Sequence, residues 1–488
     1  MFNSKYEPLI FELSAEGRSG VALPPSDVPE TKAEASIPRE MLRQDLPLPE
    51  VGEVDVIRHF ISLSQRNFGV DTGFYPLGSC TMKYNPKINE RVAGLAGLRE
   101  LHPLQPADTC QGALRLMYEL SEALAEIGGM DAVTLQPAAG ALGELTGMLM
   151  VRAYHERAGE GSRRVVIIPD SAHGTNPATA VRCGFEALNV PSNERGTVDI
   201  KKFKELLGPH VAGVMLTNPN TLGLFETEIL EICDMAHRRG ALMYCDGANM
   251  NAILGQSRPG DMGFDVMHFN LHKTFSTPHG GGGPGAGAVG VKKTLQPFLP
   301  SPTIEKSDKE YRLNFNMPES IGRVHSFYGN FSVLVRALAY IRANGPAGLR
   351  AISETAVLNA NYVRSRLLDD YDVPYGDRCM HEFVASAKRQ KDENSVRALD
   401  IAKRIIDFGF HPPTIYFPLV VEEALMIEPV ETESLQTLDA FVDAMRQIAQ
   451  EAREDPEIVK TAPHNAPVTR LDEALAARRL DVKWTPGG

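Results

Sequence analysis

Short apolar runs alternate with amphipathic stretches through the middle of this 488-residue chain. Residues 226–239 carry apolar side chains at helical spacing and precede Gly240, as expected of a helix that ends at a glycine. Strands that are apolar on both faces and alternate with helices predict an α/β domain with a large, mostly parallel sheet. Four runs have the length and composition of such buried strands: 165–169, 211–216, 241–245 and 264–269.

The pattern changes on either side of this region. Prolines recur too often in the first fifty residues for regular elements, which indicates an extended arm. Towards the C-terminus helical patterns dominate, with strand candidates at 381–386 and 414–421 and a tail that contains the lone Trp484. We therefore expect three parts: an N-terminal arm (1–55), a large α/β domain (56–330) and a smaller C-terminal α+β domain with the tail (331–488).

Composition and charge exclude several classes of protein. The chain has 50 Lys and Arg against 62 Asp and Glu, and an acidic chain without a dense basic run is a poor candidate for nucleic-acid binding. The N-terminus does not resemble a signal peptide, and no run approaches the roughly 18 apolar residues of a membrane span. The six cysteines include no Cys-x-x-Cys pair, which argues against structural zinc and a disulfide framework and favours the cytoplasm.

The strongest candidates for chemistry are an acid and a lysine that follow neighbouring strands. Asp246 closes the strand at 241–245, and Lys273 comes a few residues after the strand at 264–269. Functional groups of an open α/β sheet collect at the carboxyl ends of its strands, so both side chains are expected in one crevice. Pyridoxal phosphate requires this pair, because the lysine forms a Schiff base and the carboxylate keeps the pyridine nitrogen protonated. An ordinary salt bridge at a strand end is the alternative for these two residues alone.

Three further features follow strands in the same region. His173 is a candidate to stack on a planar cofactor, and Asn218 is a candidate to donate a hydrogen bond to a ring oxygen. The segment 137–144 (PAAGALGE) opens an apolar helix, and small residues at a helix N-terminus suit a phosphate group. Taken singly, each feature also fits a surface histidine or a tight turn. The phosphate candidates in this segment are Ala139, Gly140 and Ala141.

Two rival motifs are weaker. The glycines at 285, 287 and 290 match a dinucleotide-binding pattern, but a polar segment precedes them and a strand-like run follows, whereas that pattern needs a strand and then a helix. His268, His272 and His279 suggest metal ligands, but the residues around them alternate as in a strand and lack the glutamate of a helical zinc motif, so no metal site is predicted. His272 is instead expected to position the lysine or a substrate carboxylate.

Several motifs together resemble one enzyme family almost from end to end. The resemblance is to glycine decarboxylase, the P-protein of the glycine cleavage system, and in particular to its second subunit. The lysine and glycine stretch is the most specific part of the resemblance, and the region 385–400 is the least distinctive. The motifs are LIFELSAEGRSG (9–20), FYPLGSCTMKYNPKINE (74–90), LHPLQP (101–106), DSAHGTNPA (170–178), LTNPNTLGLFE (216–226), DGANMNA (246–252), NLHKTFSTPHGGGGPG (270–285) and APHNAPVTRLDE (462–473).

This resemblance implies a fold-type-I enzyme that uses pyridoxal 5'-phosphate. Lys273 would form the Schiff base, Asp246 would pair with the pyridine nitrogen, and His173 would stack on the ring. The family's reaction takes glycine, releases CO2 and transfers the aminomethyl group to the lipoyl arm of H-protein. A homologous subunit 1 is the expected partner, with two copies of each subunit in the assembly.

Two alternatives remain open at this stage. One is another fold-type-I pyridoxal enzyme, such as an aminotransferase or a cysteine desulfurase. The other is a non-catalytic partner subunit, against which the presence of both Lys273 and Asp246 argues. The glycine run at 280–283 is expected to approach the cofactor and to let a lipoyl arm pass, because glycine has no Cβ. Cys80 is expected to be a small buried thiol rather than a redox residue.

Overall fold

Contacts between residues divide the chain into two compact units. One unit comprises Met1–Thr72 together with Asn465–Gly488, and the other comprises Gly73–His464. The division expected from the sequence, with boundaries at residues 55 and 330, stays a prediction. The computed structural model describes residues 7–43, 46–280, 285–326, 328–483 and 485. Trp484 and the predicted role of Gly281–Gly283 therefore lie outside the described residues.

The first unit contains little regular structure in its described part. Its helices are α1 (Glu53–Gln65) and α14 (Glu473–Arg478). Before α1, the described residues form only two single turns of 3-10 helix, η1 (Ala33–Ala35) and η2 (Arg39–Met41). The prolines of this segment account for the lack of longer elements, because each fixes φ and removes a backbone donor.

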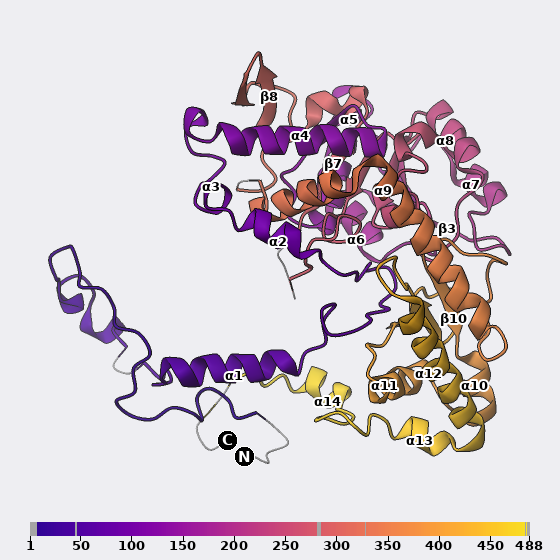
Figure 1. The fold of residues 1–488 in the computed structure, drawn as a ribbon. Coiled ribbons are helices and arrows are strands. Elements are labelled where there is room, and N and C mark those ends of the chain that lie inside the picture. The colour runs from indigo at the N-terminus through magenta and orange to yellow at the C-terminus, as the bar shows by residue number, and fades with distance from the viewer. Residues whose placement is uncertain (1–6, 44–45, 281–284, 327, 484, 486–488) are drawn as a thin grey trace. The chain divides into compact units, whose positions relative to one another are not determined.

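The second unit is built around a seven-stranded sheet with the strand order β1-β7-β6-β5-β4-β2-β3. Figure 1 labels two of these strands, β3 and β7, among the helices of the unit. The strands pair in parallel except at β7, which is antiparallel to both of its neighbours. This confirms the predicted α/β fold with a mostly parallel sheet. The strands span Ala132–Thr134 (β1), Val165–Pro169 (β2), Glu186–Val190 (β3), Val211–Thr217 (β4), Leu242–Gly247 (β5), Val266–Phe269 (β6) and Val289–Val291 (β7).

Helices cover both faces of this sheet. Successive residues of β2 alternate between two apolar cores: Ile167 packs in the core that contains α4 and α8, and Ile168 packs in the core that contains α5 and α6. The predicted helix at 226–239 is α8, and Gly240 follows it with a φ of +76°. The helices span Lys87–Ala93 (α2), Ala96–Arg99 (α3), Gln111–Gly128 (α4), Gly140–Arg157 (α5), Thr175–Arg182 (α6), Ile200–Leu206 (α7) and Ile229–Arg238 (α8).

A smaller antiparallel sheet with the order β10-β12-β11 lies in the C-terminal part of this unit. Its helices pack over it in a separate core, and the long helix α9 is interrupted at Gly345, whose φ is +62°. The elements of this part span Phe331–Leu367 (α9), Phe383–Ser386 (β10), Lys388–Asn394 (α10), Ala398–Asp407 (α11), Thr414–Ile415 (β11), Ala424–Ile427 (β12), Leu435–Glu454 (α12) and Pro456–Lys460 (α13). A hairpin and short 3-10 turns complete the unit: Thr303–Ser307 (β8), Glu310–Asn314 (β9), Ala107–Thr109 (η3), Met250–Ala252 (η4), Pro259–Met262 (η5) and Lys293–Phe298 (η6).

The strand predictions for this smaller sheet are only partly confirmed. The strand at 381–386 is confirmed as β10, but the one at 414–421 was predicted too long. It ends at Ile415 because Tyr416 takes a φ of +59° and Pro418 has no N–H to donate. β12 was not predicted, since a four-residue apolar run between glutamates does not distinguish a strand from a helix.

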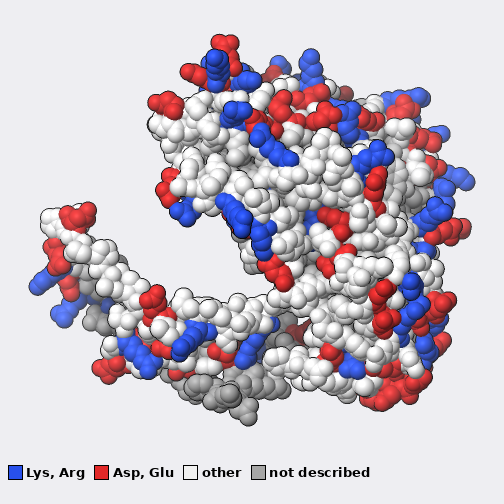
Figure 2. All heavy atoms as spheres, viewed as in Figure 1, with Lys and Arg blue, Asp and Glu red and all other residues white. Residues whose placement is uncertain are grey.

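Two surface properties bear on possible partners. In the part of the chain that the structure describes, no helix is both long enough and apolar enough to cross a bilayer. Figure 2 shows acidic and basic side chains interspersed over the face that it draws. A mixed surface of this kind differs from the cationic stripe that nucleic-acid binding requires.

Candidate functional site

A cavity of about 180 Å³ lies at the carboxyl ends of the central strands of the large sheet. Asp246 lies near the end of β5, Lys273 follows β6 and His173 follows β2, and all three line this cavity. The structure therefore brings together side chains from three separate strand ends, as expected for an open α/β sheet. The other predicted residues that line it are Gly140, Ala141 and His272.

Asp246 is fully enclosed and held by several donors. One carboxylate oxygen accepts from the Asn176 amide at 3.0 Å, and the other accepts from the Ala248 N–H at 3.0 Å. His268 Nε2 lies 3.3 Å from the same oxygen as Ala248. Burial acts to raise the pKa of Asp246, but His268, these hydrogen bonds and the charge of Lys273 together lower that pKa below its usual value. Asp246 is therefore an ionised carboxylate at neutral pH.

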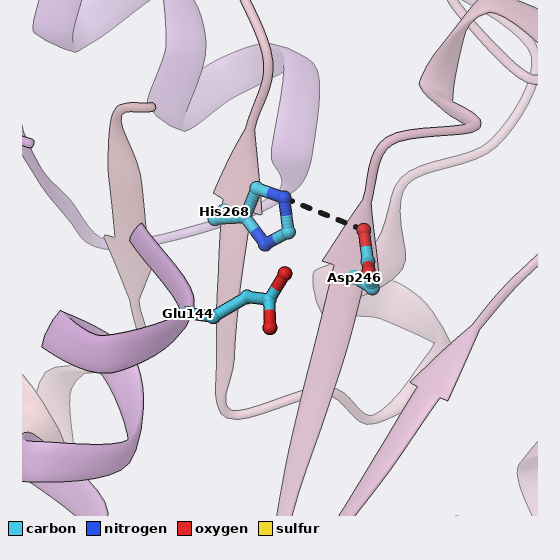
Figure 3. A group of neighbouring side chains, drawn as sticks. All are labelled: Glu144, Asp246 and His268. Atoms are coloured by element: carbon cyan, nitrogen blue, oxygen red, sulfur yellow. Dashed lines mark ion pairs between the residues drawn. The ribbon is translucent and has the colours of Figure 1, made fainter. Parts of the chain in front are cut away.

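A second set of side chains supports this carboxylate from the neighbouring elements. Figure 3 shows Asp246 and His268 on adjacent strands, with Glu144 of α5 directed towards them. The ligating atoms of these three side chains lie within 4.8 Å of one another, an arrangement that could also hold a metal ion. Hydrogen bonds within the protein engage them instead: His268 Nδ1 pairs with the Tyr244 hydroxyl at 2.6 Å, and Glu144 accepts from the Thr175 hydroxyl at 2.7 Å.

Lys273 reaches across the cavity towards a backbone carbonyl. Its Nζ donates to the Ser79 oxygen at 2.7 Å. The neighbouring His272 and His279 rings pack edge to face, with centroids 5.0 Å apart. Burial, His279 and Lys273 lower the pKa of His272 to about 3, and burial with Lys273 lowers the pKa of His279 to about 4. Both imidazoles are thus neutral beside the lysine at physiological pH.

The start of α5 also lines the cavity. Ala139 is the N-cap of this helix, so the cavity is lined by the first helical residues Gly140 and Ala141 rather than by Ala139 itself. A Cβ on Gly140 would lie 2.4 Å from the Asn270 Oδ1 atom, so only glycine allows this close approach. The first N–H groups of a helix have no partner within it, which makes this end a suitable seat for a phosphate group.

Two predicted residues have surroundings that their sequence patterns did not indicate. The His173 side chain is exposed, with Nδ1 2.7 Å from the Thr175 hydroxyl and its ring at the edge of Phe417. Asn218 does not line the cavity: its oxygen accepts the Glu226 N–H at 2.9 Å and its nitrogen lies 3.8 Å from the Met262 sulfur. Stacking by His173 and donation to a ring oxygen by Asn218 stay predictions.

Sequence reasoning missed three threonines that line the cavity: Thr175, Thr217 and Thr221. Thr217 ends β4 directly before Asn218, and Thr221 follows shortly after. Consecutive residues of a strand point to opposite faces. A prediction that is wrong by one residue therefore names the wrong side chain, and Thr217 rather than Asn218 lines the cavity. The Thr221 hydroxyl donates to the Ser171 oxygen, whereas the Thr217 hydroxyl is buried with no hydrogen-bond partner among the described residues.

Cys80 and Gly280 border this region. Cys80 is half-buried, so the expectation of a small buried thiol is only partly confirmed. Burial nevertheless raises the pKa of Cys80, and the carboxylates of Glu428 and Glu382 raise it against the opposing effect of Lys273, so the thiol is protonated at neutral pH. Gly280, which has a φ of +77°, is the only residue of the glycine run at 280–283 within the described part.

The residues present fit pyridoxal phosphate. The Thr217 hydroxyl and the Asn270 Oδ1 atom line or border the cavity and are buried without hydrogen-bond partners among the described residues, which is typical of a site built for a polar ligand. An ionised carboxylate, a lysine amine and a helix N-terminus in one cavity match the pyridine nitrogen, the aldehyde and the phosphate of this cofactor. Asp246, Lys273 and Gly140 would make these three contacts.

Comparison with solved structures supports the assignment of the fold. The chain is similar to a glycine decarboxylase (P-protein) of the glycine cleavage system in inhibitor-bound form, with a TM-score of 0.72 and 20% identity over 85% of this chain and 93% of that one. It is also similar to a cysteine desulfurase from Thermococcus onnurineus, with a TM-score of 0.59 and 16% identity over 78% of this chain and 95% of that one. At these identities the similarity shows the fold alone.

Sequence comparison identifies the family. Residues 148–312 match the aminotransferase class-V family, and residues 352–468 match the C-terminal domain of glycine dehydrogenase. A probable glycine dehydrogenase (decarboxylating) subunit 2 from Caldanaerobacter subterraneus subsp. tengcongensis is 60% identical over 99% of both chains. A protein of the same description from Bacillus velezensis is 59% identical over 99% of this chain and 98% of that one. The chain belongs to the family of decarboxylating glycine dehydrogenase subunit 2.

Proposed function

We propose that this chain is the pyridoxal-phosphate-dependent subunit of a glycine dehydrogenase that decarboxylates glycine. The observation that carries the proposal is the shared cavity of Lys273 and Asp246, with the lysine amine and an ionised carboxylate on neighbouring strand ends. Membership of a family whose relatives carry this description supports the substrate and the reaction. When bound, the cofactor supplies a conjugated ring that accepts the electron pair left on the glycine carbon as CO2 departs.

Three groups of this chain would contact the cofactor. Lys273 would hold the cofactor through its amine, which can act as a nucleophile towards an aldehyde. Asp246 would hold a proton at the pyridine nitrogen through a charge-assisted hydrogen bond, which is strong because the carboxylate is buried. The N–H groups at Gly140 and Ala141 would hold the phosphate.

The charge distribution also suits the loss of a carboxylate. Among the described residues that line the cavity, Lys273 is the only lysine or arginine. His272 lines the cavity beside it as a neutral imidazole. A substrate carboxylate can therefore be oriented by hydrogen bonds without an ion pair to a fixed cation, and its departure as CO2 breaks no such pair.

The partners belong to the same proposal. The description of the relatives as subunit 2 supports a complex with a subunit 1. Two copies of each subunit are the stoichiometry that we propose for it. The aminomethyl group that remains after decarboxylation would pass to the lipoyl arm of H-protein. The cytoplasm is the proposed location, and the six cysteines are free thiols in the structure, which suits a reducing compartment.

Reductive trapping tests the cofactor assignment. The purified chain is loaded with pyridoxal phosphate, reduced with borohydride and digested, and the modified peptide is found by mass spectrometry. We expect the modification on Lys273. Modification of another lysine, or none, would contradict the assignment. Lys204→Ala, which removes an exposed lysine of α7, is the control and should leave trapping unchanged.

Isotope exchange tests the reaction. The chain is combined with subunit 1 and lipoylated H-protein, and exchange of the glycine carboxyl group with labelled bicarbonate is followed. We expect exchange that depends on H-protein and on Lys273. Amino transfer to a keto acid, or sulfur release from cysteine, would instead support the other fold-type-I enzymes. Trapping on Lys273 without any of these reactions would leave the chain as a cofactor-binding but inactive subunit and would contradict the proposed decarboxylation.

A further inference from the structure

A segment far from Lys273 in sequence forms one wall of the site, and the small sheet fixes it. The Gly78 N–H donates to the Met426 oxygen at 3.1 Å, beside a bridge between Leu77 and Ile427 at the end of β12. A Cβ on Gly78 would lie 2.1 Å from the Met426 side chain, so the two chains are in close contact. We call residues 76–85 the crossing segment. Its other end is bonded to the turn after Lys273 (Ser276 Oγ to the Tyr84 oxygen at 2.7 Å).

Two residues of the crossing segment adopt a backbone conformation that side chains disfavour. Ser79 has a φ of +62° and Thr81 a φ of +48°, in the left-handed region. Such residues persist only where surrounding contacts hold them, and they cluster at functional sites. Here two glutamates hold them: the Ser79 N–H donates to Glu382 Oε2 at 2.7 Å, and the Thr81 N–H donates to Glu428 Oε2 at 2.9 Å. The Ser79 carbonyl oxygen, which these contacts hold in place, accepts the hydrogen bond from the Lys273 amine.

These glutamates form a closed cluster with His381. All three side chains are completely buried, and His381 Nε2 lies 3.7 Å from Glu382 Oε1 and 3.9 Å from Glu428 Oε1. The remaining two carboxylate oxygens also accept hydrogen bonds, from the Thr81 hydroxyl at 2.6 Å and the Asn249 amide at 3.2 Å. Every carboxylate oxygen thus has a protein donor, so the cluster is bound to the crossing segment and to Asn249 rather than arranged around a cation.

The charge of the cluster opposes that of Lys273. Burial and the neighbouring Glu428 raise the pKa of Glu382 well above its usual value, and burial raises the pKa of Glu428. Two carboxylates this close do not both ionise readily, so the pair retains a proton and carries one negative charge. Burial lowers the pKa of His381 to about 3, so the imidazole is neutral and does not balance that charge. The titratable groups that interact with Lys273 are Cys80, Asp246, His272, His279, His381, Glu382 and Glu428.

We propose that Glu382 and Glu428 are positioning residues for Lys273. Through Ser79 and Thr81 they hold the carbonyl that orients the lysine amine, and they place one buried negative charge next to it. This inference rests on the proposed attachment of pyridoxal phosphate to Lys273. It assigns a role to two glutamates of the small sheet that do not line the cavity.

The test compares matched variants in their binding of pyridoxal phosphate. Glu382→Gln and Glu428→Gln each keep the shape of the side chain and remove one carboxylate, and the double variant also removes the one negative charge that the pair shares. Glu423→Gln is the control, because Glu423 is also buried and accepts a hydrogen bond from a backbone N–H, that of Ala398 at 2.9 Å. Glu423 lies just before β12, whereas Glu428 lies just after it. The two glutamates are five residues apart, on the order of 15 Å along an extended strand.

The affinity for pyridoxal phosphate is measured from the visible band of the bound cofactor, and the band is then followed against pH. We expect Glu382→Gln and Glu428→Gln to bind about tenfold more weakly or worse, since a charge-assisted hydrogen bond is lost. In the double variant Glu382→Gln/Glu428→Gln we also expect the pH at which the band changes to fall by about one unit or more, because the protonated lysine–cofactor adduct then loses its opposing charge. A purely structural role would not move that pH.

A second pair of variants covers the case in which the glutamine variants do not fold. Thr81→Val removes the hydroxyl bond to Glu428 and keeps a β-branched side chain, whereas Thr81→Ser keeps the bond. We expect Thr81→Val to weaken binding and Thr81→Ser to retain it. Wild-type affinity and an unmoved pH profile in every folded variant of Glu382, Glu428 and Thr81 would overturn this inference alone. Failure of the wild-type chain to form an adduct on Lys273 would overturn the proposed function and this inference with it.

Discussion

Two groups of buried carboxylates interact with Lys273, one at the large sheet and one beside the three-stranded sheet of the second unit, and they differ in charge. Asp246 at the end of β5 is ionised, because His268 and two hydrogen bonds outweigh the effect of burial on its pKa. Glu382 and Glu428 beside β10 and β12 are equally buried, yet the pKa of each is raised. Burial is common to both regions, so the difference comes from what surrounds each carboxylate.

The difference fits two separate tasks. A carboxylate that must stabilise a protonated pyridine nitrogen has to be ionised itself, and the donors around Asp246 ensure this. The glutamate pair has to fix a backbone segment beside an amine, and one shared negative charge is enough for that purpose. Lys273 lies where both regions act on it, so variants in each region should fail in different ways.

Loss of the amine should have the largest effect. Lys273→Ala removes the only proposed attachment point, so we expect no trapped cofactor and no measurable exchange of the glycine carboxyl group. The measurement is mass spectrometry after borohydride reduction, together with the exchange assay. Trapped cofactor at the usual level on another residue would show that neither carboxylate region acts on the reactive amine.

Loss of the ionised carboxylate should come next. We expect Asp246→Asn to retain much of its cofactor but to lose turnover by about 10²-fold or more, since removing one partner of a buried pair costs about 3–5 kcal/mol. Exchange rates and cofactor content should be measured on the same samples. Asp234→Asn, on the exposed surface of α8, is the control. Near-wild-type exchange in Asp246→Asn would remove the distinction between the two carboxylate regions.

A change at the phosphate end should have a moderate effect on binding only. In Gly140→Ala the new Cβ would lie 2.4 Å from Asn270 Oδ1, so either the Asn270 side chain or the start of α5 must shift at the cavity. We expect affinity for pyridoxal phosphate to fall by about tenfold, because small displacements of positioning groups have large effects. Gly112→Ala is the matched control, since Gly112 lies in α4 with no atom within 4 Å of the new Cβ, and it should be neutral or slightly stabilising. Equal affinities for the two variants would contradict the phosphate assignment.

The smallest effect concerns stability against pH in the glutamate cluster. The pKa of His381 is about 3 in the folded chain, below the value of about 6.5 in an unfolded chain. Below pH 6.5 the unfolded chain therefore binds a proton that the folded chain does not, and stability falls as the pH decreases from about 6.5 towards 3. We expect His381→Phe to reduce the slope of unfolding free energy against pH in this window by up to about 1.4 kcal/mol per pH unit. Denaturant unfolding at several pH values measures it, and an unchanged slope would mean that His381 is protonated in the folded chain.

The sequence was most informative where chemistry follows a strand directly. Asp246 lies at the end of β5 and Lys273 shortly after β6, and the rule that functional groups collect at the carboxyl ends of parallel strands predicts that they share a crevice. Gly140 was predicted for a related reason, since a turn of small residues before an apolar helix marks a helix N-terminus. The same rule does not distinguish one residue from the next at a strand end. It therefore predicted Asn218, whereas the preceding residue, Thr217, lines the cavity.

The glutamate cluster could not be predicted in the same way. Glu382 and Glu428 are more than 100 residues from Lys273 and belong to another sheet, one strand of which, β12, was itself missed. Ser79 acts through its carbonyl oxygen, which every residue type possesses, so its position in the resembling motif indicated no role. Such contacts depend on how two sheets are joined, and hydrophobic periodicity does not carry that information.

The most direct test of the account is the protonation state of the cofactor ring. Pyridoxal phosphate labelled with 15N at the pyridine nitrogen is bound to the wild-type chain and to Asp246→Asn, and the nitrogen chemical shift is measured by NMR. The account predicts a protonated nitrogen in the wild-type chain and a neutral one in the variant. The same shift in both proteins would show that Asp246 does not face this nitrogen, and the assignment of the cavity would be contradicted.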